Sequence, residues 1–255
     1  MLKNIFPVKV LLKPSEVFSR IAAGKTGWGW PLGLYVVSVS GSAFLLSVLP
    51  PQFITDSFEG VALPQGRGYW FYFGISLPGG FLFTLFAGAL LSAFTVFLRE
   101  GRLSLRLALA ALATGACGLL AAAAHGSAAL RPAGFAAALA AAAFAFWASL
   151  RDRGRYSAIL KAMLSISALS LAADLAGGAA ALAGSIKAYA ATAYFFSFLS
   201  LIWLSKAAAA VYDSATPRAA SAAVLAVLCA TAFLFLLHNL RVLPAELFQV
   251  LLLGA

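Results

Sequence analysis

WFYFGISLPGGFLFTLFAGALLSAFTVFL, residues 70–98, runs for more than eight helical turns without a charged side chain. A helix of about 20 apolar residues is long enough to cross the hydrocarbon layer of a bilayer, which is about 30 Å thick. Hydrocarbon offers main-chain amides no hydrogen-bond partner, so a segment that crosses it must be helical. The stretch Trp70–Leu98 therefore predicts a transmembrane helix.

Further apolar runs predict more crossings, at Trp30–Leu49, Leu107–Ala124, Ala133–Leu150, Ala162–Gly184, Ala188–Leu204 and Ala220–Leu240. The runs Leu107–Ala124 and Ala133–Leu150 consist mainly of alanine, which gains little from lipid, and this pair could instead form a shallow hairpin. The chain is 63% hydrophobic and only 10% charged, whereas soluble domains are about 25% charged. We expect an all-α fold: a polytopic helical membrane protein with about 5–7 transmembrane helices.

The basic residues test this topology independently, because cytoplasmic segments of membrane proteins carry an excess of Lys and Arg. With the N-terminus inside, most of the 18 basic residues fall on the inner side: Lys3, Lys9, Lys13, Arg20, Lys25, Arg99, Arg102, Arg106, Arg151, Arg153, Arg155, Lys161, Lys206 and Arg218. The outer segments hold Arg67, Arg131, Lys187 and Arg241. We therefore predict a cytoplasmic N-terminus, an outer C-terminus and a multi-pass location in the bacterial cytoplasmic membrane.

Residues 1–29 form a basic, amphipathic N-terminal segment ahead of the transmembrane domain, residues 30–240, and a short apolar C-terminal tail, residues 241–255. Leu2, Ile5 and Phe6 share one helical face, and Val17, Phe18 and Ile21 share another, with Ser15 as the expected N-cap and Gly24 as the expected stop.

Lys3, Lys9, Lys13, Arg20 and Lys25 are interleaved with these apolar positions. The pattern favours contact between these cations and anionic lipid headgroups on the cytoplasmic side. Packing of the segment against the protein's own inner face is an equal alternative, and both could hold.

Other functional classes find little support in the sequence. The net charge of +10 is explained by membrane orientation rather than by nucleic-acid binding, because the cations lie in short stretches between apolar runs. Cys117 and Cys229 form no CxxC pair, and His125 and His238 lack an acidic cluster. We expect no cofactor, no metal and no catalytic activity, since no nucleophile and base can be paired.

Asp174 is the main outlier within the apolar runs, because a carboxylate in a transmembrane helix costs about 2.5–3.5 kcal/mol on insertion scales. Ser167, Ser170, Asp174 and Gly178 recur at three- and four-residue spacing and share one helix face. We expect this stripe to point into the bundle, as an intramembrane polar site or as a hydrogen bond between helices. A third option is that Gly177 and Gly178 end the helix early and leave Asp174 near the outer surface.

Several segments resemble the bacterial branch of the Yip1-domain family. The resemblance lies in Leu11-Leu12-Lys13-Pro14-Ser15-Glu16-Val17-Phe18-Ser19-Arg20-Ile21, the entry Trp28-Gly29-Trp30-Pro31-Leu32, the basic turn Arg102–Arg106 and the ending Leu201–Leu204 with its last apolar helix. The match covers both ends of the chain better than the middle. It implies five spans, a cytoplasmic N-terminus and the opposite location for the C-terminus, and it implies no assigned catalysis.

Two functional hypotheses follow. The first is a membrane-organising protein that binds lipids, other membrane proteins or further copies of itself. The alternative is a small transporter or permease subunit that uses the polar stripe around Asp174.

Overall fold

The computed structural model describes residues 6–50, 52–55 and 67–254, and these segments contain helices and no strand. In chain order, the elements are α1 (Phe6–Leu12), α2 (Pro14–Ala22), α3 (Gly29–Val48), α4 (Gln52–Thr55), α5 (Tyr69–Arg99), α6 (Leu103–Gly126), the 3₁₀ turn η2 (Ala128–Leu130), α7 (Arg131–Leu150), α8 (Arg153–Leu182), α9 (Ile186–Tyr212), α10 (Thr216–Asn239) and α11 (Ala245–Gly254). The all-α prediction is confirmed.

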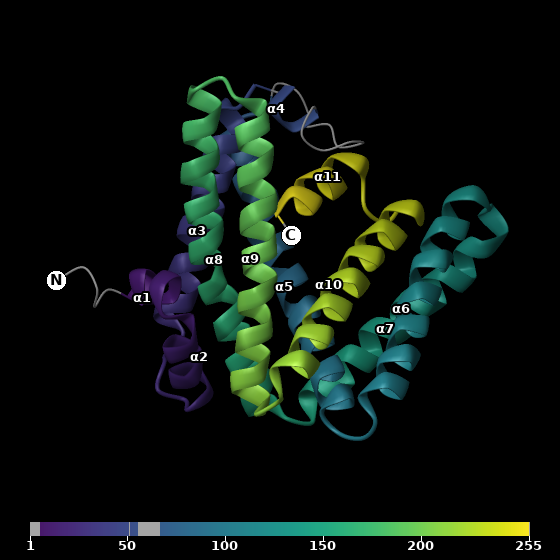
Figure 1. The fold of residues 1–255 in the computed structure, drawn as a ribbon. Coiled ribbons are helices and arrows are strands. Elements are labelled where there is room, and N and C mark those ends of the chain that lie inside the picture. Colours follow the sequence, from purple (N-terminus) through teal and green to yellow (C-terminus); the bar gives the residue numbers. More distant parts are fainter. Residues whose placement is uncertain (1–5, 51, 56–66, 255) are drawn as a thin grey trace.

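Within the described residues, six helices are long and apolar enough to cross a membrane: α3, α5, α6, α8, α9 and α10. The alanine-rich helix α7 has a shorter apolar stretch and runs antiparallel to α6 as a helical hairpin beside α10 (Figure 1). The chain is thus a multi-pass helical membrane protein, and its six candidate spans among the described residues fall inside the predicted range.

Helices α8 and α9 are longer than their apolar runs. α8 begins nine residues before Ala162, at Arg153, and α9 continues eight residues past Leu204, to Tyr212. At 1.5 Å per residue, the 30 residues of α8 span about 45 Å, which exceeds the hydrocarbon thickness. Hydropathy shows which residues suit lipid, but it does not show where the main-chain hydrogen bonds of a helix end. The charged ends of α8 and α9 were therefore not predicted.

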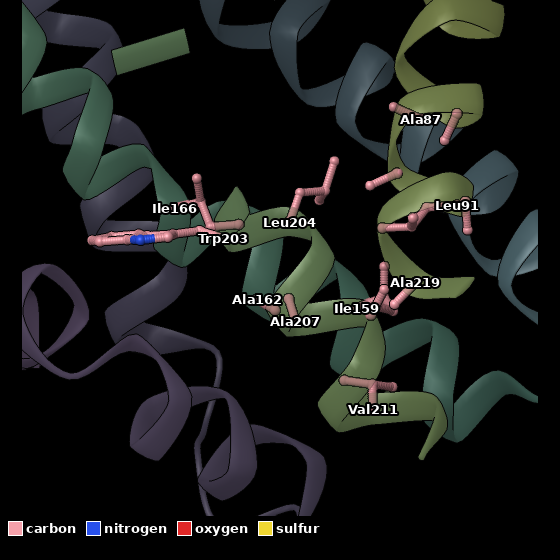
Figure 2. Close-up of a cluster of buried hydrophobic side chains, with 14 of the residues drawn as sticks. Ala87, Leu91, Ile159, Ala162, Ile166, Trp203, Leu204, Ala207, Val211 and Ala219 are labelled. Carbon is pink, nitrogen blue, oxygen red and sulfur yellow. The ribbon is translucent and has the colours of Figure 1, made fainter. Parts of the chain in front are cut away.

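Small residues set the packing of the central helices α5, α8, α9 and α10. Figure 2 shows alanines among larger apolar side chains, with Ala162 of α8 beside Ala207 of α9, and both are fully buried. A Cβ atom added to Gly88 of α5 would lie 2.9 Å from a methyl group of Leu160 in α8. Because the helices are already surrounded by lipid, the hydrophobic effect stabilises contacts between them only weakly. Close packing of their backbones stabilises these contacts instead.

The helix α5 runs through Pro78 without interruption. Proline cannot donate to the helical ladder and crowds the preceding turn. At this point the hydroxyl of Tyr35 in α3 donates to the carbonyls of Ser76 and Leu77, at 3.1 and 2.6 Å. Gly80 leaves room for the phenol, since a Cβ there would lie 2.9 Å from its oxygen.

The N-terminal helices α1 and α2 pack against the transmembrane bundle. Val10, Val17, Phe18 and Ile21 are at most 2% exposed and belong to the same buried cluster as the side chains of α8 and α9. Helix α2 starts at Pro14, so Ser15 lies inside the helix and the predicted N-cap is wrong. Proline suits the first position because its missing N–H has no helical partner there. Gly24 has a φ of +72° just after the helix, as expected of a stop.

The C-terminal residues form a helix rather than a simple tail. Helix α11 packs against α5 and α10, with Val250 and Phe248 buried. Gly79 of α5 accommodates Leu251, because an added Cβ would lie 2.5 Å from its side chain. The ion pair between Arg67 and Glu246, at 3.1 Å, ties α11 to the start of α5.

The helices alternate in direction, so α3, α6, α8 and α10 start where α5, α7 and α9 end (Figure 1). This gathers residues 6–28, 99–106, 151–161 and 206–218 toward one end of the bundle, which we call the basic end. Every cation that the sequence assigns to the inner side lies in these segments, apart from Lys3, which falls outside the described residues.

Replacing Phe18 with alanine should lower the free energy of unfolding by about 3–5 kcal/mol, because the ring is fully buried between α2 and the bundle. Unfolding of the purified protein in mixed micelles with increasing dodecyl sulfate measures this. Phe44→Ala is the matched control, since that ring is 62% exposed and should cost far less. Equal losses for the two variants would contradict the docking of α2.

Candidate functional site

Asp174 lies in the C-terminal part of α8. The helix continues for eight residues beyond it, to Leu182, so Asp174 stands about 12 Å from the C-terminal helix end at 1.5 Å per residue. Gly177 and Gly178 do not end the helix, and that option is wrong. Asp174 thus lies past the middle of the helix, because α8 starts at Arg153, well before the apolar run.

The carboxylate of Asp174 is held at the contact between α3 and α8. The hydroxyl of Ser42 in α3 donates to Oδ2 of Asp174 at 2.6 Å. Gly41 permits this approach, since a Cβ there would lie 3.2 Å from Leu171 and 3.7 Å from the same carboxylate oxygen. A distance of 2.6 Å is at the short end of the range for O–H···O hydrogen bonds, and the pair joins α3 to α8 at this register.

The serine stripe does not point into the bundle as a whole. Ser167 is half-buried, whereas Ser170 is exposed. Ser170 precedes Asp174 by one turn and lies about 40° around the helix from it, which takes it to the edge of the α3–α8 contact. The expectation of a continuous inward polar stripe is therefore wrong, and the polar site consists of Asp174 with Ser42.

Sequence reasoning missed Ser42 as the partner of Asp174. Ser38 and Ser42 are four residues apart on one face of α3, and Ser38 is buried. The available signal was that a carboxyl group within an apolar helix needs a hydrogen-bond partner, and that Ser42 lies at a comparable distance from the C-terminal end of α3.

The N-terminal cations surround the docked face of α1 and α2. Lys13, Arg20 and Lys25 are exposed and Lys9 is half-buried. Only a long 4.0 Å contact joins Lys13 to Glu16, so it adds little. The N-terminal segment packs against the protein, which is the second of the two alternatives predicted from the sequence. The cations nevertheless point away from the core and can meet a headgroup.

A lysine from the transmembrane domain fixes the connection between α2 and α3. Nζ of Lys161 in α8 donates to the carbonyl of Thr26 at 3.0 Å and stands 5.2 Å from the ring centre of Trp28. The contact holds Trp28 at the entry to α3, where Trp28 and Trp30 are 39% and 58% exposed. Exposed tryptophans at a helix entry are typical of the bilayer interface.

The described residues contain no group of three or more His, Cys, Asp or Glu side chains that could hold a metal ion. His238 instead stacks on Phe248, with ring centres 4.5 Å apart; the side chain of His125 lies outside what the structure describes. Cys117 and Cys229 are free thiols beside a small apolar cavity of about 20 Å³ between α5, α6, α7 and α10.

Comparison with protein-family models, with curated proteins and with solved structures found no match to this chain.

Removing the donor with Ser42→Ala should cost about 1–2 kcal/mol in the free energy of unfolding, because Asp174 keeps its place in α8 and loses its partner. Ser47→Ala is the control: its hydroxyl donates within α3, to the carbonyl of Phe44. A double-mutant cycle with Asp174→Ala should show coupling between Ser42 and Asp174. No coupling, with equal costs for both serine variants, would show that the bond contributes nothing.

Proposed function

We propose that this multi-pass protein is a non-catalytic, Yip1-like membrane-organising protein that binds anionic lipid headgroups at its basic end. The observation that carries the proposal is the docking of α1 and α2. Their apolar face is buried in the bundle, while Lys13, Arg20 and Lys25 remain exposed. The segment therefore holds its cations at fixed positions on the bundle and is not a free amphipathic helix.

The docking also determines how the segment would act on lipid. A free amphipathic helix inserts its apolar face into the acyl chains, but here Val17, Phe18 and Ile21 are already buried. Recognition then rests on charge, at about 1 kcal/mol for each Lys or Arg near an anionic surface, and weakens within a Debye length as salt rises. Cations held at fixed positions can bind an anionic lipid, or a membrane partner that carries one, at a defined place on the protein.

Arg20→Gln combined with Lys25→Gln should lower the preference of the protein for phosphatidylglycerol over phosphatidylcholine at least several-fold. Quenching of tryptophan fluorescence by brominated forms of each lipid in vesicles measures this, since the exposed Trp28 and Trp30 follow Lys25 by three and five residues. The matched control is Lys187→Gln with Arg241→Gln, which removes two exposed cations from the opposite end. An unchanged preference in the first double variant, or an equal loss in both, would refute the proposal.

A second candidate function is transport of a proton or small cation, and the specific observation behind it is the carboxylate of Asp174 at a helix contact. Proteoliposomes with an internal pH dye and an imposed potassium-diffusion potential test it directly. Asp174→Asn should abolish a proton flux that the wild type shows, while Ser47→Ala leaves the flux intact. Wild-type vesicles without flux, or an Asp174→Asn variant that retains it, would eliminate this candidate.

A further inference from the structure

Two arginines from different parts of the chain converge on the turn between α5 and α6. Arg218, in the first turn of α10, donates to the carbonyls of Leu98, Arg99 and Gly101, the last at 3.2 Å. Arg106, in the first turn of α6, donates to the carbonyl of Phe97. Both guanidinium groups are thereby held at the C-terminal end of one helix.

Gly101 leaves space for the side chain of Arg106 at the end of α5. Its φ of +74° is a left-handed conformation, and an added Cβ would lie 2.8 Å from Nε and 3.2 Å from Cζ of Arg106. The carbonyl of the same glycine accepts from Arg218. Both guanidinium groups therefore lie close to this one residue: Arg218 bonds its carbonyl, and Arg106 occupies the space that a Cβ atom would need.

Neither half-buried guanidinium has a carboxylate partner. The ion pairs of the described residues join Lys13 to Glu16, Arg67 to Glu246 and Arg155 to Asp152, and none of them includes an arginine of this turn. Two further arginines, Arg99 and Arg102, are exposed beside the pair, and the acid of the turn, Glu100, is exposed as well. Four guanidinium groups against one carboxylate leave the turn strongly positive.

Capping of α5 accounts for only part of this arrangement. Partial negative charge at a helix C-terminus attracts a cation, and one arginine would satisfy it. Each guanidinium has five N–H donors in a planar fork, and the carbonyl contacts use one donor of Arg106 and three of Arg218. The remaining donors, with those of Arg99 and Arg102, match the oxygens of a phosphate group.

We propose that Arg106 and Arg218, flanked by Arg99 and Arg102, form a binding site for a phosphate anion at the basic end of the bundle. The turn joins two candidate spans, α5 and α6, and the ends of spans lie close to the headgroup region that holds the lipid phosphates. The ligand class is a phosphate ester or phosphate itself. This inference goes beyond the lipid contacts proposed for α2, because it uses other residues and a prearranged geometry.

The experiment is native mass spectrometry of the full chain in a neutral detergent, titrated with phosphatidylglycerol or phosphatidylcholine. The first phosphatidylglycerol should bind at least ten-fold more tightly than phosphatidylcholine. Gly101→Ala should weaken this binding at least five-fold although it removes no charge, because its Cβ displaces Arg106. Arg106→Gln with Arg218→Gln should weaken it further, and Lys187→Gln with Arg241→Gln should not.

Inorganic phosphate identifies the source of the ligand. If millimolar phosphate displaces the first phosphatidylglycerol, the site accepts free phosphate; if it does not, the site requires the lipid, and either result supports the site. Wild-type affinity in both Gly101→Ala and Arg106→Lys, a variant that keeps the charge and loses the fork, would overturn the proposal. Loss of the first lipid only in Arg20→Gln with Lys25→Gln would also overturn it, while leaving the function proposed for α2 intact.

Discussion

The whole structure depends on one constraint: a main-chain N–H or C=O group in hydrocarbon must find its partner within the protein. Continuous helices meet it along the spans, and side chains contribute where a helix ends. Arg106 and Arg218 donate to the last carbonyls of α5.

The second level of organisation is contact between helices through small residues. Gly41 brings α3 against α8 and lets Ser42 reach Asp174. Gly88 does the same for α5 against α8. In lipid, such contacts gain dispersion energy and hydrogen bonds rather than hydrophobic burial. The N-terminal helices follow the opposite rule, because α1 and α2 carry an amphipathic pattern and bury their apolar face in the usual way.

Hydropathy and charge were enough to predict the helices and their alternation, since each depends on the transfer free energy of single residues. The same information could not show that α8 begins at Arg153, because a helix continues outside lipid wherever its ladder is unbroken. Nor could it pair Asp174 with Ser42 or bring Arg218 to the turn at Gly101. These contacts join residues more than a hundred positions apart in the sequence. They depend on the distance and register at which two helices pack against each other. The docking of α2 stood as one of two alternatives, since an amphipathic face suits lipid and protein equally.

The central claim is that the basic end faces the cytoplasm and carries the docked N-terminal segment. Single cysteines placed at the exposed positions Ser104, Ala129, Ala183 and Ala215 in a Cys117→Ser, Cys229→Ser background test it in intact cells with a membrane-impermeant maleimide. The account predicts labelling from outside at positions 129 and 183, and labelling at positions 104 and 215 only after the cells are opened. Outside labelling at 104 or 215 would invert the topology and contradict the account.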